Sequence, residues 1–132
     1  MSATNRYVEP VEQLVTEILV RNIESSTRFY LSLGFKLLRD GGDFVELTWE
    51  DHRLFLAEIS AFHEAGAVEP SLPPKFPPAN LRVMVPNVDD CWKRANEIGA
   101  AIVIPIENRY YGLRDFIIAD PDGFGIRFAT TL

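Results

Sequence analysis

The sequence predicts an α+β protein made of two consecutive βαβββ modules that form a cupped mixed sheet. Two observations support this fold. Asn22 is followed twelve residues later by Gly34, and Asn87 is followed at the same interval by Gly99. A segment that alternates apolar and polar residues precedes each Asn, as expected of a half-buried strand. The two intervals start 65 positions apart (87 − 22), which indicates an internal duplication.

Each Asn-to-Gly interval predicts one capped helix. An Asn side chain accepts hydrogen bonds from the first helical turn, and Gly adopts the left-handed conformation that ends a helix. Apolar residues recur at helical spacing in both intervals, so each helix has one face to bury. These residues are Ile23, Phe29, Tyr30 and Leu33 in the first interval and Val88, Cys91, Trp92, Ala95 and Ile98 in the second.

Strands are expected before and after each helix, where apolar residues alternate with polar ones. The first module is predicted to contain strands within residues 15–20, 35–39, 44–49 and 53–59, and the second within residues 80–85, 101–104, 114–119 and 125–129. A longer loop is expected through residues 107–112. The segment Asp120-Pro121-Asp122-Gly123 predicts a hairpin turn, because Pro fixes φ and Gly tolerates positive φ.

Five prolines between residues 61 and 78 are incompatible with the interior of a helix or strand, so this segment is predicted to be a linker. The predicted organisation is one domain, residues 1–132. It contains a first unit at 14–60, the linker at 61–78 and a second unit at 79–130.

Composition limits the partners and the location of the protein. The 13 basic and 19 acidic residues give a net charge of −6, which argues against a nucleic-acid partner. No segment is long and apolar enough to cross a membrane, and the first residues lack an apolar signal core, so a cytoplasmic location is expected. The single cysteine, Cys91, excludes an internal disulfide, and its place in a predicted helix favours the core over a reactive thiol.

The duplicated module, the segment Phe29-Tyr30-x-x-Leu33-Gly34-Phe35 and the Asp-Pro-Asp-Gly turn at 120–123 resemble the vicinal oxygen chelate superfamily. That superfamily includes glyoxalase I, extradiol dioxygenases, fosfomycin resistance enzymes and bleomycin resistance proteins. The similarity extends over residues 14–128 and implies the same fold. It does not assign a function, because the superfamily contains both enzymes and non-catalytic binders.

The resemblance implies that metal-dependent members hold a divalent ion with His, Gln or Glu side chains on the first and last strands. The matching positions in this chain hold Val15, Phe55, Asn80 and Arg127. Val and Phe have no donor atom, Asn alone is a weak ligand, and Arg is a permanent cation that repels a metal. The two histidines, His52 and His63, are expected at the surface. No metal site and no cofactor are therefore predicted.

The inward face of the predicted sheet retains a polar and aromatic set that is expected to bind a small molecule. Its members are Glu17, Phe44, Glu46, Thr48, Phe55, Asn80, Arg82 and Arg127. Glu17 is expected either to form a structural ion pair with Arg82 or Arg127, or to orient a polar ligand together with them. The sign of the ligand's charge stays open, because the carboxylates favour a cation and the guanidinium groups an anion.

The bleomycin resistance branch resembles this chain best, because its members are small, acidic, lack the metal ligands and bind a cationic aromatic antibiotic in clefts of a dimer. Tyr111 matches the position at which that branch carries a ligand-stacking Trp, and Tyr110 lies beside it. Alternatively, Tyr111 covers the rim of the sheet as an ordinary loop residue. The resemblance also implies a homodimer.

Three functions remain open from the sequence. The preferred one is a non-catalytic protein that sequesters an aromatic or antibiotic-like small molecule, because the metal positions lack donors. The second is a lyase, isomerase or dioxygenase with a rearranged metal site, or with metal-free acid–base chemistry by Glu17 or Glu46. The third is a regulatory or structural module with a vestigial cup.

Overall fold

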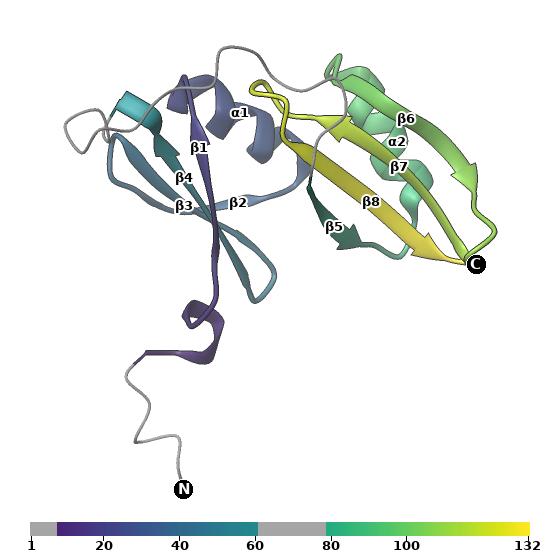
Figure 1. Ribbon diagram of the computed structural model, residues 1–132, viewed down its shortest axis with the longest axis horizontal. Coiled ribbons are helices and arrows are strands. Elements are labelled where there is room, and N and C mark those ends of the chain that lie inside the picture. The colour runs from purple at the N-terminus through teal and green to yellow at the C-terminus, as the bar shows by residue number, and fades with distance from the viewer. Residues whose placement is uncertain (1–7, 61–78) are drawn as a thin grey trace, which may run out of the picture. The chain divides into compact units, whose positions relative to one another are not determined.

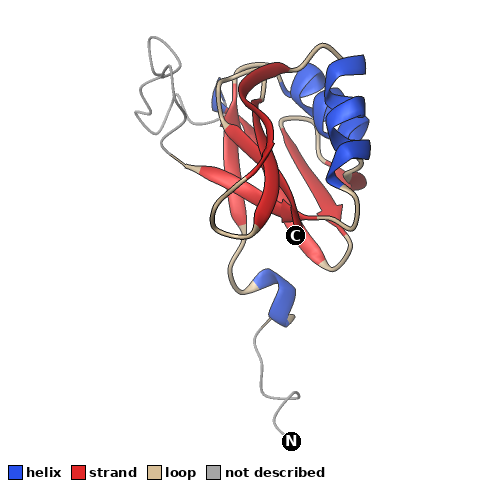
Figure 2. Cartoon of the chain, turned by 90° about the vertical axis from the view of Figure 1, so that its right-hand side faces the viewer, coloured by secondary structure: helices blue, strands red, loops and turns tan. Residues whose placement is uncertain are grey.

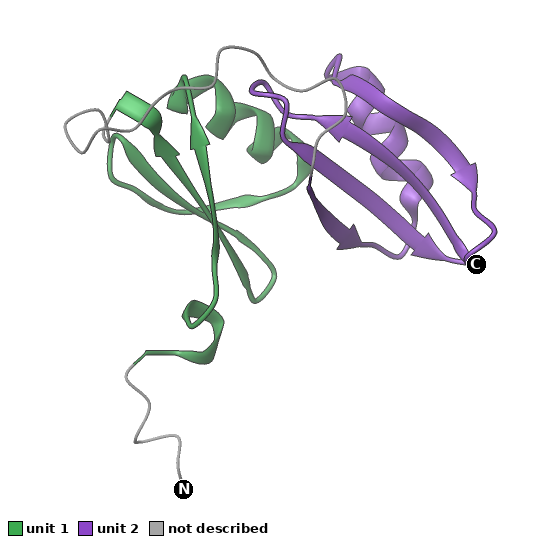
Figure 3. Cartoon of the chain, in the orientation of Figure 1, with its two compact units in different colours: residues 1–69 green, residues 70–132 purple. Residues whose placement is uncertain are grey.

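The computed structural model describes residues 8–60 and 79–132, which belong to two compact units (Figure 1). Unit 1 lies within residues 1–69 and unit 2 within residues 70–132 (Figure 3). The predicted linker at 61–78 and His63 lie outside the described residues. Each unit contains an α-helix and a four-stranded mixed sheet, so the predicted α+β fold of two βαβββ modules is confirmed.

The first described element of unit 1 is a short 3-10 helix, η2 (Pro10–Glu12). The strand order of its sheet is β1-β4-β3-β2, with β1 parallel to β4 and the other neighbours antiparallel. Its elements in chain order are β1 (Thr16–Val20), α1 (Ile23–Leu33), β2 (Lys36–Asp40), β3 (Phe44–Trp49) and β4 (His52–Glu58).

Unit 2 repeats this topology with the strand order β5-β8-β7-β6, in which β5 is parallel to β8. Figure 2 shows the helices in blue and the strands in red. Neither α-helix of the described residues is long and apolar enough to span a membrane. The elements are β5 (Asn80–Met84), α2 (Val88–Glu97), β6 (Ala101–Asn108), β7 (Leu113–Ala119) and β8 (Gly125–Thr131).

Both helices start at the predicted caps. Oδ1 of Asn22 accepts a hydrogen bond from the backbone N–H of Ser25 at 3.0 Å, and Oδ1 of Asn87 accepts one from Asp89 at 3.2 Å. The predicted glycines, Gly34 and Gly99, come just after the last helical residues. Both have a positive φ, which Gly adopts at little cost. The repeated interval in the sequence therefore corresponds to a repeated capped helix.

Each core lies between the helix and the strand residues of one parity. Trp92 reaches the unit 2 core from α2, with its ring centroid 5.1 Å from that of Phe116. The largest fully buried side chains include Tyr30, Leu47 and Leu56 in unit 1 and Phe116, Ile118, Ile126 and Phe128 in unit 2. Strand residues of the other parity are left to form the opposite face of each sheet.

Of the sixteen predicted strand ends, seven coincide with the structure, eight differ by one or two residues, and one differs by four. β6 continues to Asn108 rather than ending at Ile104, so most of the predicted loop at 107–112 is a tight turn. β6 tolerates Pro105 because it is the edge strand and its register with β7 shifts on both sides of Ile104. His52, predicted in a turn, is the first residue of β4.

We expect Gly34→Ala to destabilise the protein more than Gly99→Ala. At Gly34 φ is +116° and an added Cβ would lie 3.1 Å from Cζ3 of Trp49, whereas at Gly99 φ is +71° and nothing lies within 4 Å. The left-handed conformation costs a residue with a Cβ about 1–2 kcal/mol, and only Gly34 adds a steric conflict. Urea denaturation measures both losses; equal losses would show that Trp49 accommodates the methyl group.

Candidate functional site

The candidate site residues lie on the sheet face opposite the helix, here called the distal face of each unit. Successive side chains in a strand point to opposite faces, so residues that alternate with the core share this face. The distal face of unit 1 carries Glu17, Phe44, Glu46, Thr48 and Phe55, and that of unit 2 carries Asn80, Arg82, Asp115, Ile117 and Arg127.

Asp115 of β7 is the centre of a hydrogen-bonded network on the distal face of unit 2. Its side chain is only 3% exposed. Oδ1 accepts a hydrogen bond from Nε of Arg109 at 2.7 Å. Oδ2 accepts one from Nε of Arg127 at 2.9 Å and one from the Tyr111 hydroxyl at 2.8 Å. A buried carboxylate needs such partners, so the network explains how an acidic residue is accommodated in a largely buried strand.

Two arginines hold Asp115 in its ionised form. Burial raises the pKa of Asp115, but the hydrogen bonds from Arg109, Arg127 and Tyr111 together lower it by more. The pKa therefore lies below its ordinary value. The hydrogen bond to Asp115 in turn raises the pKa of Arg109. Arg109 also ties the network to the edge strand, since Nη1 lies 2.8 Å from Oε2 of Glu107.

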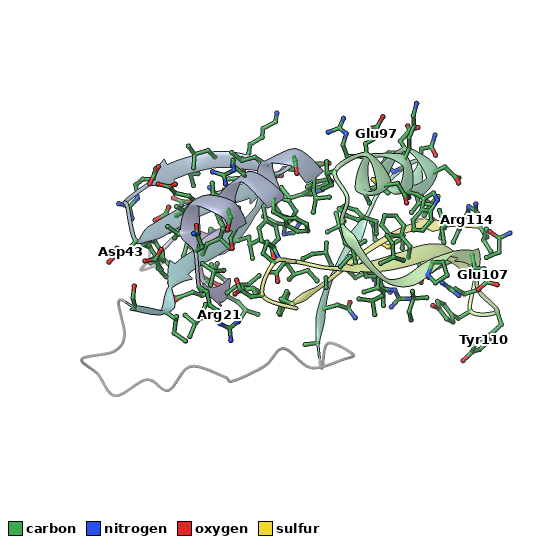
Figure 4. The ribbon with its side chains drawn as sticks, turned by 90° about the horizontal axis from the view of Figure 1, so that it is seen from above. Arg21, Asp43, Glu97, Glu107, Tyr110 and Arg114 are labelled. Carbon is green, nitrogen blue, oxygen red and sulfur yellow. The ribbon has the colours of Figure 1, made fainter. Side chains whose placement is uncertain are left out.

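Tyr111 lies over this network at the turn between β6 and β7. The guanidinium carbon of Arg127 is 5.3 Å from the centroid of its ring, a cation–π distance, and Nη2 of Arg127 donates a hydrogen bond to its hydroxyl at 2.8 Å. Tyr110 is fully exposed and projects away from the body of unit 2 (Figure 4), and its ring meets that of Tyr111 edge to face with centroids 5.2 Å apart. Of the two predicted tyrosines, only Tyr111 is hydrogen-bonded within the network.

Removing the hydroxyl in Tyr111→Phe is expected to lower the free energy of unfolding by about 1 kcal/mol. Burial raises the pKa of Tyr111, and the hydrogen bond to Asp115 raises it further. A raised pKa contributes stability below about pH 10 that is lost as pH rises through the folded-state value. The stability difference from the wild type should thus shrink in alkali, as measured by urea denaturation at several pH values. Tyr110→Phe is the matched control and should show no such difference.

The distal face of unit 1 carries an aromatic pair beside two carboxylates. Phe44 and Phe55 meet edge to face with ring centroids 5.2 Å apart. Phe55 pairs in the sheet register with Glu17 on one side and Glu46 on the other, so these three residues form a row. Oε2 of Glu46 accepts hydrogen bonds from Nε and Nη2 of Arg39 at 3.1 and 2.7 Å. The structure therefore brings Glu17, Phe44, Glu46 and Phe55 together, and the fifth residue predicted in unit 1, Thr48, lies on the same face opposite Arg53.

The two distal faces differ in charge at equivalent places. Glu17 pairs with Phe55 across the parallel strands β1 and β4, and Arg82 pairs with Arg127 across β5 and β8. Glu17 and Arg82 are 65 positions apart (82 − 17), the interval of the internal duplication. One module thus carries a carboxylate and an aromatic ring where the other carries two guanidinium groups.

Residues 12–128 match the Glyoxalase/Bleomycin resistance protein/Dioxygenase superfamily. The chain belongs to this superfamily. The match is to the superfamily as a whole and does not single out the bleomycin resistance branch. No curated protein matches the chain significantly.

Solved structures share the superfamily fold with this chain over nearly its whole length. A hypothetical protein from S. aureus is 20% identical, with a TM-score of 0.77 and coverage of 98% of this chain and 99% of that chain. A protein of unknown function from Agrobacterium tumefaciens is 24% identical, with a TM-score of 0.76 and coverage of 96% and 98%. A glyoxalase/bleomycin resistance protein/dioxygenase from Nocardioides is 17% identical, with a TM-score of 0.74 and coverage of 98% and 89%. These likenesses show the fold.

The positions at which the superfamily is expected to hold a metal do not fit one in this chain. Val15 and Phe55 offer no donor, and Arg127 is a cation bonded to Asp115. Asp115 itself has both oxygens engaged by arginine and tyrosine donors, so it is not available as a ligand. Within residues 8–60 and 79–132, no three His, Cys, Asp or Glu side chains are grouped to hold a metal ion.

Cys91 has the environment of a core residue rather than that of a nucleophile. It is half-buried in α2. Burial raises the pKa of its thiol, and the charge of Asp90 raises it further, which opposes formation of the reactive thiolate.

Sequence reasoning missed the two residues that organise the network, Asp115 and Arg109. The carboxylate bonded to Arg127 is Asp115 of the neighbouring strand, whereas Glu17 was one of the partners that the sequence left open. One signal was present: Asp115 directly precedes the apolar run Phe116-Ile117-Ile118-Ala119 within a predicted strand, at the parity of the distal face.

Proposed function

We propose that this superfamily member is a non-catalytic protein that binds and sequesters an aromatic or antibiotic-like small molecule without a metal. The observation that carries the proposal is the bonding of Arg127, which stands at an expected metal position and is tied to Asp115 and Tyr111. A guanidinium group so held can orient a ligand, but it neither coordinates a metal nor exchanges protons near neutral pH.

Aromatic side chains on the distal faces support the binding part of the proposal. Tyr111 is 48% exposed, and Phe44 and Phe55 are half-buried, so each ring is held by the protein and can also contact a ligand. Apolar area removed from water contributes about 25 cal/mol per Å², and the neighbouring charged groups would fix the ligand's orientation. The proposal includes a homodimer, the assembly that the family resemblance implies.

Metal-free acid–base catalysis finds less support in the geometry. A catalytic carboxyl must be oriented and free to exchange a proton. Glu46 is engaged by two hydrogen bonds from Arg39, which oppose its use as a proton acceptor. The exposed side chain of Glu17 makes no hydrogen bond to any other described residue that would orient it.

Screening a panel of aromatic compounds by ligand-observed NMR tests the proposed function. We expect saturable binding that survives EDTA, and bound compounds that mass spectrometry shows to be unchanged after incubation. Tyr111→Ala should weaken binding about three- to tenfold through loss of the ring. Tyr110→Ala should have a smaller effect, because that ring is fully exposed and touches the network only through its edge contact with Tyr111. Turnover of the compound, or binding that depends on a stoichiometric divalent ion, would contradict the proposal.

A further inference from the structure

We infer that the distal face of unit 2 binds an organic anion, with a carboxylate or phosphate group attached to an apolar body; this inference rests on the proposed function and specifies its ligand. The site is formed by one row of residues that crosses the four strands of the sheet. Ile104 pairs with Ile117, Ile117 with Arg127, and Arg127 with Arg82. Because directly paired residues share a face, Ile117 is flanked by Ile104 on one side and by the two arginines on the other.

The two arginines have hydrogen-bond donors to offer. Arg127 uses Nε and Nη2 to bind Asp115 and Tyr111, and its Nη1 has no partner within residues 8–60 and 79–132. The side chain of Arg82 is exposed and, over the same ranges, makes no hydrogen bond or ion pair. Guanidinium N–H groups match the oxygens of carboxylates and phosphates in both charge and geometry.

The charges of the network leave this part of the face positive. The cations Arg109 and Arg127 are balanced by Asp115 and Glu107, so Arg82 adds an uncompensated charge beside them. Asp115 does not repel the ligand as a free carboxylate would, because both of its oxygens already accept hydrogen bonds. Its bonds also hold Arg127 in one orientation, which reduces the entropy lost when an anion binds.

The isoleucines define the apolar half of the site. Ile117 is 8% exposed and Ile104 is half-buried, so both present a small apolar surface next to the cations. Neighbouring strands lie about 4.8 Å apart, so the row from Ile104 to Arg82 extends about 14 Å. A monocyclic aromatic acid fits this length, with its ring over the isoleucines and its anionic group at Arg127 and Arg82.

Isothermal titration calorimetry with simple probes tests the inference. Benzoate and phenyl phosphate are the anionic probes, benzyl alcohol and benzylamine replace the anion by a neutral or cationic group, and acetate and inorganic phosphate lack the ring. We expect benzoate, phenyl phosphate or both to bind at least about tenfold more tightly than the other four. The ratio between these two affinities distinguishes a carboxylate from a phosphate ligand.

A pair of charge-matched variants separates the site from a general effect of net charge. Arg82→Gln should weaken binding of the preferred anion about tenfold and leave the fold intact, because this side chain is exposed. Arg94→Gln removes the same charge from α2, on the helix side of the sheet, and should leave the affinity unchanged. Equal weakening by both variants would overturn the inference, as would benzylamine binding as tightly as benzoate.

The outcomes also separate this inference from the proposed function. Preferential binding of benzylamine without turnover would overturn the anion site and leave non-catalytic binding standing. Tight binding of benzoate that is lost with EDTA, or chemical conversion of the probe, would overturn the proposed function and leave the preference for anions standing.

Discussion

Replacing Asp115 with Asn is expected to lower the free energy of unfolding by about 3 kcal/mol. The carboxylate is 3% exposed and is the shared acceptor for Arg109, Arg127 and Tyr111. The amide has nearly the same shape, but it is uncharged and directs an NH₂ group at one of these donors. At least one arginine then loses its acceptor in a site with little access to water. Leaving that buried charge unpaired costs more free energy than the intact ion pair contributes to stability. Urea denaturation measures the loss.

This loss of stability is expected to depend on pH. Burial raises the pKa of Asp115, but its hydrogen bonds together lower the pKa by more, so the net shift is downward. A lowered pKa contributes stability that is complete above about pH 4 and is lost as pH falls through the folded-state value. The difference between wild type and Asp115→Asn should therefore shrink on acidification below about pH 4.

Asp51→Asn is the matched control for this experiment. Asp51 lies in the exposed turn before β4, and its replacement should change stability by less than about 0.5 kcal/mol at any of these pH values. A loss for Asp115→Asn that is constant from neutral to strongly acidic pH would show that shape, rather than ion pairing, makes this residue important.

Phe116→Ala is expected to destabilise the protein by about 3–5 kcal/mol. The side chain is fully buried, with its ring 5.1 Å from that of Trp92 and 5.7 Å from that of Phe128. The cavity cannot close easily, because β7 is hydrogen-bonded between β6 and β8 and its backbone is held on both sides. Urea denaturation measures the loss, and the near-ultraviolet circular dichroism of Trp92 should change as its edge contact is removed.

Two further variants serve as references for the loss of stability in Phe116→Ala. Tyr110→Ala removes a fully exposed aromatic ring from the same unit and should be nearly neutral. Phe116→Leu keeps most of the buried volume and should cost less than half as much as Phe116→Ala. Similar stabilities for Phe116→Ala and Tyr110→Ala would mean that the unit 2 core repacks around the missing ring.

The helices were the most predictable part of the fold because their signals are local. Asn22 and Asn87 cap the helices through residues two or three positions away, and the glycines act within one turn of the last helical residue. The end of β6 was not predictable in this way. Its extension past Pro105 depends on pairing with β7 and on two shifts of register, which are properties of the partner strand.

Alternation along the strands was sufficient to predict which residues share the distal faces, including the row of Glu17, Phe55 and Glu46. It was not sufficient to predict which of them bond to each other. The network joins Arg109 in a turn with Asp115 and Arg127 on two strands, and these side chains meet only after the strands have paired. Register and turn geometry therefore decide the chemistry of this face.

The ion-pair network also limits how this protein can evolve. In Arg127→Glu, the new carboxylate at a family metal position would face Asp115, which would retain only Arg109 as a bonded cation. Two carboxylates that share a poorly hydrated site repel each other, so this first step would lower stability before any metal affinity was gained. Further donors would still be needed at Val15 and Asn80. A protein in which Asp115 is bonded to Arg127 would thus have to pass through a less stable intermediate before it could chelate a metal. Substitutions around Arg82, in contrast, can alter ligand preference one at a time.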